Sequence, residues 1–126
     1  MKKVVFIDRG NILRSPMAKG IYNSLKNDDS MAFAYGTNVI KEGVEGLLLS
    51  DYPGIMDAIL TLKSHGIDIS NEHCTQLIPE YLKDSFKIVV MTEREDIPSW
   101  LQEYNYEYWE NSLCKRHKGM AGMAFR

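Results

Sequence analysis

The chain has 126 residues and a mass of 14.5 kDa, so we expect a single domain covering residues 1–126. Its 44% hydrophobic and 25% charged residues are typical of a globular protein. The formal net charge of −2 does not favour nucleic acid or an anionic membrane as a partner. No apolar run approaches the roughly 18–20 residues of a membrane span or the core of a signal peptide. We therefore expect a cytoplasmic protein.

The first predicted elements are a strand and a helix near the N-terminus. Residues 4–7 (VVFI) form a continuous run of β-branched and aromatic residues, which is typical of a central parallel strand buried on both faces. Ser15 and Pro16 are favoured residues for a helix start, as N-cap and first helical residue. An apolar face follows at helical spacing, made of Ala18, Ile21, Tyr22 and Leu25.

The rest of the chain continues this alternation. Residues 31–35 predict a strand that ends at Gly36, and residues 55–62 predict a helix that stops near Gly66. Residues 86–91 (FKIVVM) predict another buried strand, residues 97–104 a short helix, and residues 106–109 an edge strand. Strands alternating with helices indicate an α/β fold with a parallel sheet and right-handed crossovers.

The segment after the first strand has the composition of an anion-binding loop. Gly10 and Asn11 tolerate left-handed backbone conformations, which lets successive N–H groups point inward as a nest. The following helix directs the positive end of its dipole at the same point, and Arg14 adds a guanidinium that matches phosphate. The alternative from spacing alone is an ordinary strand-to-helix turn with a surface arginine.

The run VVFIDRGNILRSPMAKGIY resembles the phosphate loop of the low-molecular-weight protein tyrosine phosphatases and the related arsenate reductases. That family's pattern is a hydrophobic strand followed by Cys-x-Gly-Asn-x-Cys-Arg-Ser-Pro-Met-Ala. Matching residues are Gly10, Asn11, Arg14, Ser15, Pro16, Met17 and Ala18. Weaker similarity continues at residues 34–37, 66–73 and 88–93, so that the likeness covers about residues 2–110. It implies a three-layer α/β fold with a four-stranded parallel sheet and helices on both faces.

The departures from the family pattern concern the catalytic groups. The family's cysteine nucleophile corresponds to Asp8, while Arg14 and Ser15 remain, within a phosphate loop of Arg9, Gly10, Asn11, Ile12, Leu13 and Arg14. Carboxylate is a weak nucleophile toward phosphorus, and its charge repels a phosphate dianion. We expect the Asp8 carboxylate to accept the loop N–H groups itself and to pair with Arg14.

Two further catalytic features of the family have no counterpart. Leu13 stands where the family has a second cysteine, which removes a partner for reversible oxidation. The family's general acid lies in a late Asp-Pro pair, whereas the last aspartate here is Asp96. Glu110 is a weak candidate for a substitute acid. Loss of nucleophile and acid together predicts that the family's hydrolysis does not occur.

A histidine and two cysteines complete the candidate residues. The resemblance implies that His73 supports the loop by contacting Asn11, although a surface histidine is the alternative from the residues alone. Cys74 and Cys114 lack CxxC spacing, so no disulfide, metal site or cofactor is expected. We expect both to be inert thiols, although the basic residues 115–118 can lower the pKa of Cys114.

The resemblance stops at Glu110, and residues 111–126 diverge from it. Family members continue into a long helix that packs on the sheet, whereas this segment has two glycines and no amphipathic repeat. A missing helix leaves apolar surface bare, which favours self-association. A truncation or a change of reading frame after Glu110 would account for the divergence.

Three classes of function remain open. The first is a catalytically inactive phosphatase homologue whose partner is a phosphate or phosphotyrosine-like oxyanion, unless Asp8 excludes it. The second is a phosphotyrosine phosphatase with residual activity, or one in which Asp8 was introduced for a natural cysteine. The third is aspartyl-phosphate chemistry of the haloacid-dehalogenase type, although Gly10 stands in place of that superfamily's second aspartate.

Overall fold

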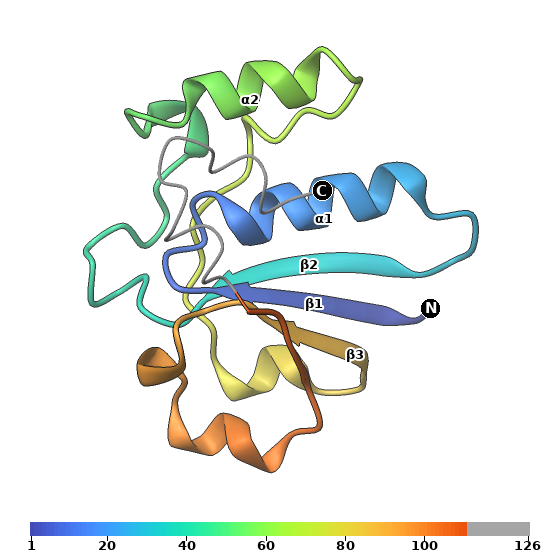
Figure 1. Ribbon diagram of the computed structural model, residues 1–126, viewed down its shortest axis with the longest axis vertical. Coiled ribbons are helices and arrows are strands. Elements are labelled where there is room, and N and C mark those ends of the chain that lie inside the picture. The colour runs from blue at the N-terminus through green and yellow to red at the C-terminus, as the bar shows by residue number, and fades with distance from the viewer. Residues whose placement is uncertain (111–126) are drawn as a thin grey trace.

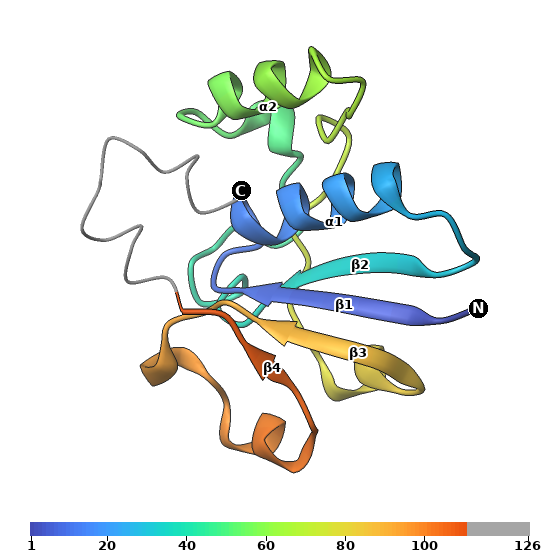
Figure 2. The same ribbon diagram turned by 45° about the vertical axis from the view of Figure 1, so that its right-hand side comes forward.

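The computed structural model, which describes residues 1–110, contains the expected four-stranded parallel sheet, in the order β2-β1-β3-β4 (Figures 1 and 2). The strands are β1 (Lys3–Asp8), β2 (Met31–Gly36), β3 (Ser85–Val90) and β4 (Glu107–Tyr108). The α-helices are α1 (Arg14–Leu25) and α2 (Met56–Lys63). Short 3₁₀ helices are η1 (Leu49–Asp51), η2 (Pro79–Leu82), η3 (Arg94–Asp96) and η4 (Ser99–Glu103).

The central strand β1 is buried on both faces, which explains its uninterrupted apolar sequence. Val4 and Phe6 pack in a cluster with Ala18 and Tyr22 of α1. The intervening Val5 and Ile7 pack on the opposite face, in a cluster that includes residues of η2 and η4. Because side chains alternate along a strand, the four apolar residues of β1 contribute alternately to two separate cores.

The layers differ in part from the expected arrangement. Helix α1 covers one face of the sheet, and α2 packs against α1 rather than on the sheet (Figures 1 and 2). The opposite face is covered by the 3₁₀ helices η2 and η4 in place of α-helices. The helix predicted over residues 97–104 is thus a 3₁₀ helix over Ser99–Glu103, too short to form two α-helical turns. Helices thus cover both faces of the sheet as predicted, but on one face they are 3₁₀ helices.

The start and the exposed face of α1 also differ from the sequence-based prediction. The helix begins at Arg14, and Ser15 is a helical residue rather than the N-cap. Its hydroxyl accepts a hydrogen bond from the Asn11 side chain at 2.8 Å and is therefore used inside the loop. Leu25, predicted on the buried face, is 77% exposed because nothing covers the end of α1 in the structure of residues 1–110.

The strand order places the loop after β1 at a topological switch point. The chain moves from β1 to β2 on one side and later to β3 on the other side of β1. In open parallel sheets, ligands bind at this kind of point, beyond the carboxyl ends of the strands. No helix within residues 1–110 is both long and apolar enough to cross a membrane.

Candidate functional site

The Asp8 side chain lies inside the loop that connects β1 to α1. The loop N–H of Asn11 donates to its Oδ1 at 2.6 Å, and the N–H of Ser15 donates to its Oδ2 at 2.9 Å. Each oxygen of the carboxyl group therefore satisfies one backbone donor near the start of α1. The expected acceptance of loop N–H groups by Asp8 agrees with this geometry.

Asn11 gives the loop its shape through its backbone and its side chain. Its φ of 55° is left-handed, a conformation that asparagine tolerates better than most residues. Its amide nitrogen donates to the Ser15 hydroxyl, and its amide oxygen accepts the N–H of Thr75 at 2.7 Å. Gly10, by contrast, has no left-handed backbone in the structure, so its predicted role in the nest is not needed.

The end of β2 approaches this loop closely enough to require glycine. A Cβ built on Gly36 would lie 2.6 Å from Val39 Cγ2 and 2.8 Å from both the Arg9 carbonyl oxygen and the Asn11 nitrogen. Backbone atoms cannot move aside for a methyl group as a flexible side chain can. Gly36 thus holds the loop against the neighbouring strand.

Burial governs the protonation of Asp8. The residue is 2% exposed, and the desolvation of its charged form raises the pKa of its carboxyl group above the ordinary value. The Ser15 N–H, the charge of Arg14, the Asn11 N–H and the Ser15 hydroxyl all favour the charged form but do not reverse the shift. The carboxyl group accordingly binds its proton more tightly than an exposed aspartate does.

The Arg14 guanidinium binds groups other than Asp8. Its Nη1 donates to the Met91 carbonyl oxygen at 2.7 Å, and its Nη2 lies 3.6 Å from Glu93 Oε1. The predicted ion pair between Arg14 and Asp8 is therefore wrong, since no such pair occurs in the structure of residues 1–110. The segment after β3 supplies a nearer acceptor, and Arg14 affects Asp8 only through its charge.

Arg9 is likewise held by carboxylates at the outer side of the loop. Its Nη2 lies 3.1 Å from Glu42 Oε2, and its Nε lies 3.4 Å from Asp96 Oδ2. Asn38 donates to the other oxygen of Asp96 at 3.1 Å, which fixes that carboxylate. Both arginines near the loop thus have anionic partners from the chain itself.

The open side of the loop borders a cleft of about 360 Å³. Its lining combines loop residues with apolar and acidic residues from other segments, namely Asp8, Arg9, Gly10, Ile12, Leu13, Arg14, Glu42, Tyr52, Ile55 and Glu93. Three carboxyl groups and two guanidinium groups are present in this lining. An anion-binding site normally has the opposite balance.

Comparisons with known proteins identify relatives of this chain. No family model matches the chain. Over 101 residues, the chain is 32% identical to "Probable low molecular weight protein-tyrosine-phosphatase EpsP" of Ralstonia nicotianae, a match that covers 79% of this chain and 63% of the relative. The chain is a homologue of the low-molecular-weight protein tyrosine phosphatases. It spans less than two thirds of the length of this relative.

Solved structures agree with this homology. The low-molecular-weight protein tyrosine phosphatase from T. tengcongensis is 33% identical, with a TM-score of 0.57 over 72% of this chain and 58% of that chain. An arsenate reductase in its phosphate-binding state is 25% identical, with a TM-score of 0.61 over 86% of this chain and 76% of that chain. The three-layer fold implied by the sequence motif is therefore that of known structures.

Two candidate residues from the sequence lie away from the roles considered for them. His73 is exposed, and within residues 1–110 its imidazole makes no hydrogen bond to Asn11, so its predicted support of the loop is wrong. The backbone N–H of Thr75 provides that support instead. Glu110 is exposed and is absent from the lining of the loop cleft.

The cysteines of the homologue fall in different parts of the chain. Cys74 is fully buried, and burial, followed by the charges of Asp8 and Glu45, raises the pKa of its thiol to about 11. This agrees with an inert thiol, because the thiolate is the reactive form. Cys114 and the divergent segment 111–126 lie outside the described residues.

Sequence reasoning missed the residues that reach the loop from distant segments. Gly36, Thr75, Glu42, Glu93 and Asp96 all contact the loop or its arginines. Gly36 is the exception in having a sequence signal, because it ends a predicted strand next to the loop. The others are ordinary polar residues, whose spacing gives no indication of their partners.

Proposed function

We propose that this chain is a low-molecular-weight protein tyrosine phosphatase homologue that does not hydrolyse phosphate esters and whose phosphate loop is filled by its own Asp8. The observation that carries the proposal is the pair of hydrogen bonds from the Asn11 and Ser15 N–H groups to the two Asp8 oxygens. In an anion-binding nest, these are the donors that an incoming oxyanion needs. Cytoplasmic localisation remains part of the proposal.

Electrostatics supports the exclusion of phosphate. Above its raised pKa, Asp8 is negatively charged, and two like unit charges 4 Å apart repel by about 4 kcal/mol at an effective dielectric constant of 20. A phosphate dianion doubles that repulsion. Arg14 does not offset it fully, because its guanidinium already binds the Met91 carbonyl oxygen and the Glu93 carboxylate.

The absence of a suitable nucleophile and of a general acid also argues against hydrolysis. The family mechanism requires a thiolate that attacks phosphorus and an acid that protonates the leaving oxygen. Both Asp8 oxygens accept backbone hydrogen bonds, which lowers their nucleophilicity, and the chain has no Asp-Pro pair in its late loops. Oxyanion binding, as in the phosphate-binding state of the related arsenate reductase, requires removal of the Asp8 carboxyl group.

Phosphate binding and turnover of p-nitrophenyl phosphate test this proposal. We expect no turnover by the unsubstituted chain and no rise of its melting temperature with inorganic phosphate relative to chloride at equal ionic strength. Asp8→Ala should gain a phosphate-dependent rise, and Asp8→Ala/Arg14→Ala, the matched control, should lose it. Phosphate stabilisation of the unsubstituted chain, or metal-independent turnover by it, would contradict the proposal.

Two variants separate the alternatives. Metal-independent turnover that first appears in Asp8→Cys identifies residue 8 as the main lost group, whereas an inactive Asp8→Cys that binds phosphate identifies the absent acid. Magnesium-dependent turnover by the unsubstituted chain, abolished in Asp8→Asn, would instead indicate aspartyl-phosphate chemistry of the haloacid-dehalogenase type.

A further inference from the structure

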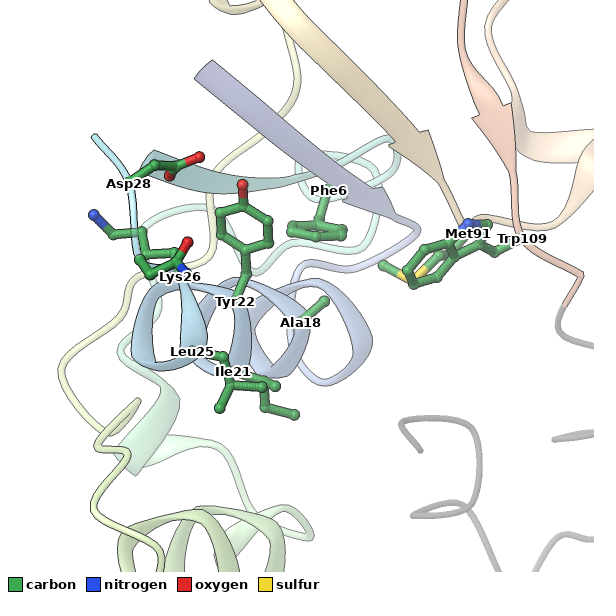
Figure 3. Close-up of a pocket in the computed structure, with 10 residues that line it drawn as sticks. Phe6, Ala18, Ile21, Tyr22, Leu25, Lys26, Asp28, Met91 and Trp109 are labelled. Carbon is green, nitrogen blue, oxygen red and sulfur yellow. The ribbon is translucent and has the colours of Figure 1, made fainter. Parts of the chain in front are cut away.

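A groove of about 460 Å³ runs beside α1, on the face of the sheet that this helix covers. We call it the α1 groove. It is lined by Phe6, Ala18, Ile21, Tyr22, Leu25, Lys26, Asn27, Asp28, Met91 and Trp109. Figure 3 shows Met91 and Trp109 together at one end, Phe6 between, and Lys26 and Asp28 at the other end. The groove is separate from the loop cleft, since the two have no lining residue in common.

Large apolar side chains of the groove remain open to solvent. Leu25 is 77% exposed and Trp109 is 43% exposed. Trp109 is fixed in place, because its backbone N–H donates to the Val90 carbonyl oxygen at 2.8 Å and its ring lies 6.0 Å from that of Phe6. Trp109 therefore cannot move into the groove to bury itself. A segment that covered the groove would be stabilised by burial of this apolar surface.

The described part of the chain ends beside the α1 groove. Trp109, one of its walls, directly precedes Glu110, the last described residue, and sixteen residues follow. As an extended chain these sixteen residues reach about 50 Å, and as a helix about 24 Å. Helix α1, with twelve residues, is about 18 Å long. The following segment is thus long enough to run the whole length of the groove.

Charge favours this segment over a second copy of the described part. Residues 111–126 contain four Lys or Arg residues and no acidic residue, whereas residues 1–110 contain eleven Lys or Arg and seventeen acidic residues, a net charge of −6 with histidine neutral. Two copies of the described part repel each other through this net charge, whereas the basic segment is attracted to it. The segment also has apolar residues that suit the groove, namely Leu113, Met120, Met123 and Phe125.

We propose that residues 111–126 bind in the α1 groove of their own chain. Their apolar side chains then cover Leu25 and Trp109, and their basic residues are attracted by the net negative charge of residues 1–110. The proposal is independent of the state of Asp8. Docking of a second copy in the same groove, expected from a bare apolar face alone, is the competing occupant.

Paramagnetic broadening in the full-length protein tests the proposal. A nitroxide is attached to Gly122→Cys in a Cys114→Ser background, where the buried Cys74 does not react because its thiol pKa is about 11. In ¹⁵N-labelled protein, we expect the amide signals of residues 22–25 to weaken strongly. Those of η2, on the opposite face of the sheet, serve as the reference and should persist.

Matched variants establish that the groove is responsible. Leu25→Glu should lower the ratio of docked to free segment about tenfold or more, because it removes the burial of one leucine side chain. Leu60→Glu places the same charge at a 55% exposed leucine of α2, outside the groove, and should leave the broadening unchanged. Phe125→Glu, which alters only the segment, should reproduce the effect of Leu25→Glu.

Three results would overturn the proposal. Equal broadening of residues 22–25 and of η2 would mean that the segment has no preference for the groove. Broadening that is unaffected by Leu25→Glu and Phe125→Glu would assign it to another surface. Broadening in a mixture of ¹⁵N-labelled protein without nitroxide and unlabelled protein with nitroxide would identify a second copy as the occupant.

Discussion

Asp8→Asn should remove the pH-dependent contribution of Asp8 to the free energy of unfolding. The substitution keeps the shape of the side chain but removes its titration. Asp8 has a raised pKa in the folded protein because burial disfavours its charge, whereas the unfolded chain retains the ordinary value of 3.8. Between these two pKa values, the folded state binds more protons than the unfolded state, so rising pH favours unfolding.

The size of the pH effect follows from the binding of one proton to Asp8. The free energy of unfolding of the unsubstituted chain, minus that of Asp8→Asn, should be largest below pH 3.8. It should fall by up to about 1.4 kcal/mol for each pH unit between the two pKa values and be constant above the folded value. The asparagine side chain of the variant can accept only one of the two backbone hydrogen bonds, which adds an offset of about 1–3 kcal/mol that does not depend on pH.

Urea unfolding followed by circular dichroism from pH 3 to pH 8 measures this difference. The carboxyl groups of Asp28, Asp68 and Glu107 have lowered pKa values through hydrogen bonds to neighbouring side chains, and their opposite pH dependence cancels because both proteins contain them. A difference that is flat, or that rises with pH, would refute the reasoning. It would mean that the donors of the loop outweigh the burial of Asp8.

Three further predictions concern the surroundings of the loop. Gly36→Ala should cost about 1–3 kcal/mol in urea unfolding, because its methyl group meets loop backbone at 2.8 Å. Gly10→Ala is the control and should cost less, because its methyl group meets side-chain atoms, at 3.3 Å for Ile12 and 3.6 Å for Glu42. Asn11→Ala should cost about 2–4 kcal/mol, from two lost buried hydrogen bonds and a left-handed backbone, and equal stability would contradict this role. Cys74 should resist iodoacetamide at pH 8 until urea unfolds the chain, as measured by mass spectrometry, because about one thiol in a thousand is ionised at that pH; rapid native labelling would disprove it.

The local parts of the fold and site were predictable from sequence because each depends on neighbouring residues. The apolar run of β1 indicates a strand buried on both faces, and this burial is present. Asp8, Asn11 and Ser15 lie within eight residues of one another, so the loop they form is encoded locally. Its donors reach Asp8 through a turn whose left-handed residue, Asn11, is visible in the sequence.

Partners that come from distant segments were decided only by the tertiary structure. Arg14 binds Met91 and Glu93, which are 77 and 79 positions away in the sequence. Asp8 is much nearer to Arg14 in the sequence, which is why an ion pair between these two residues was predicted. The support of Asn11 comes from the backbone N–H of Thr75, a group that every residue except proline has. Such contacts depend on how strands and loops meet in space, and a backbone donor leaves no trace in the sequence. The motif thus determined the loop and its unusual aspartate, while packing determined which charges surround it.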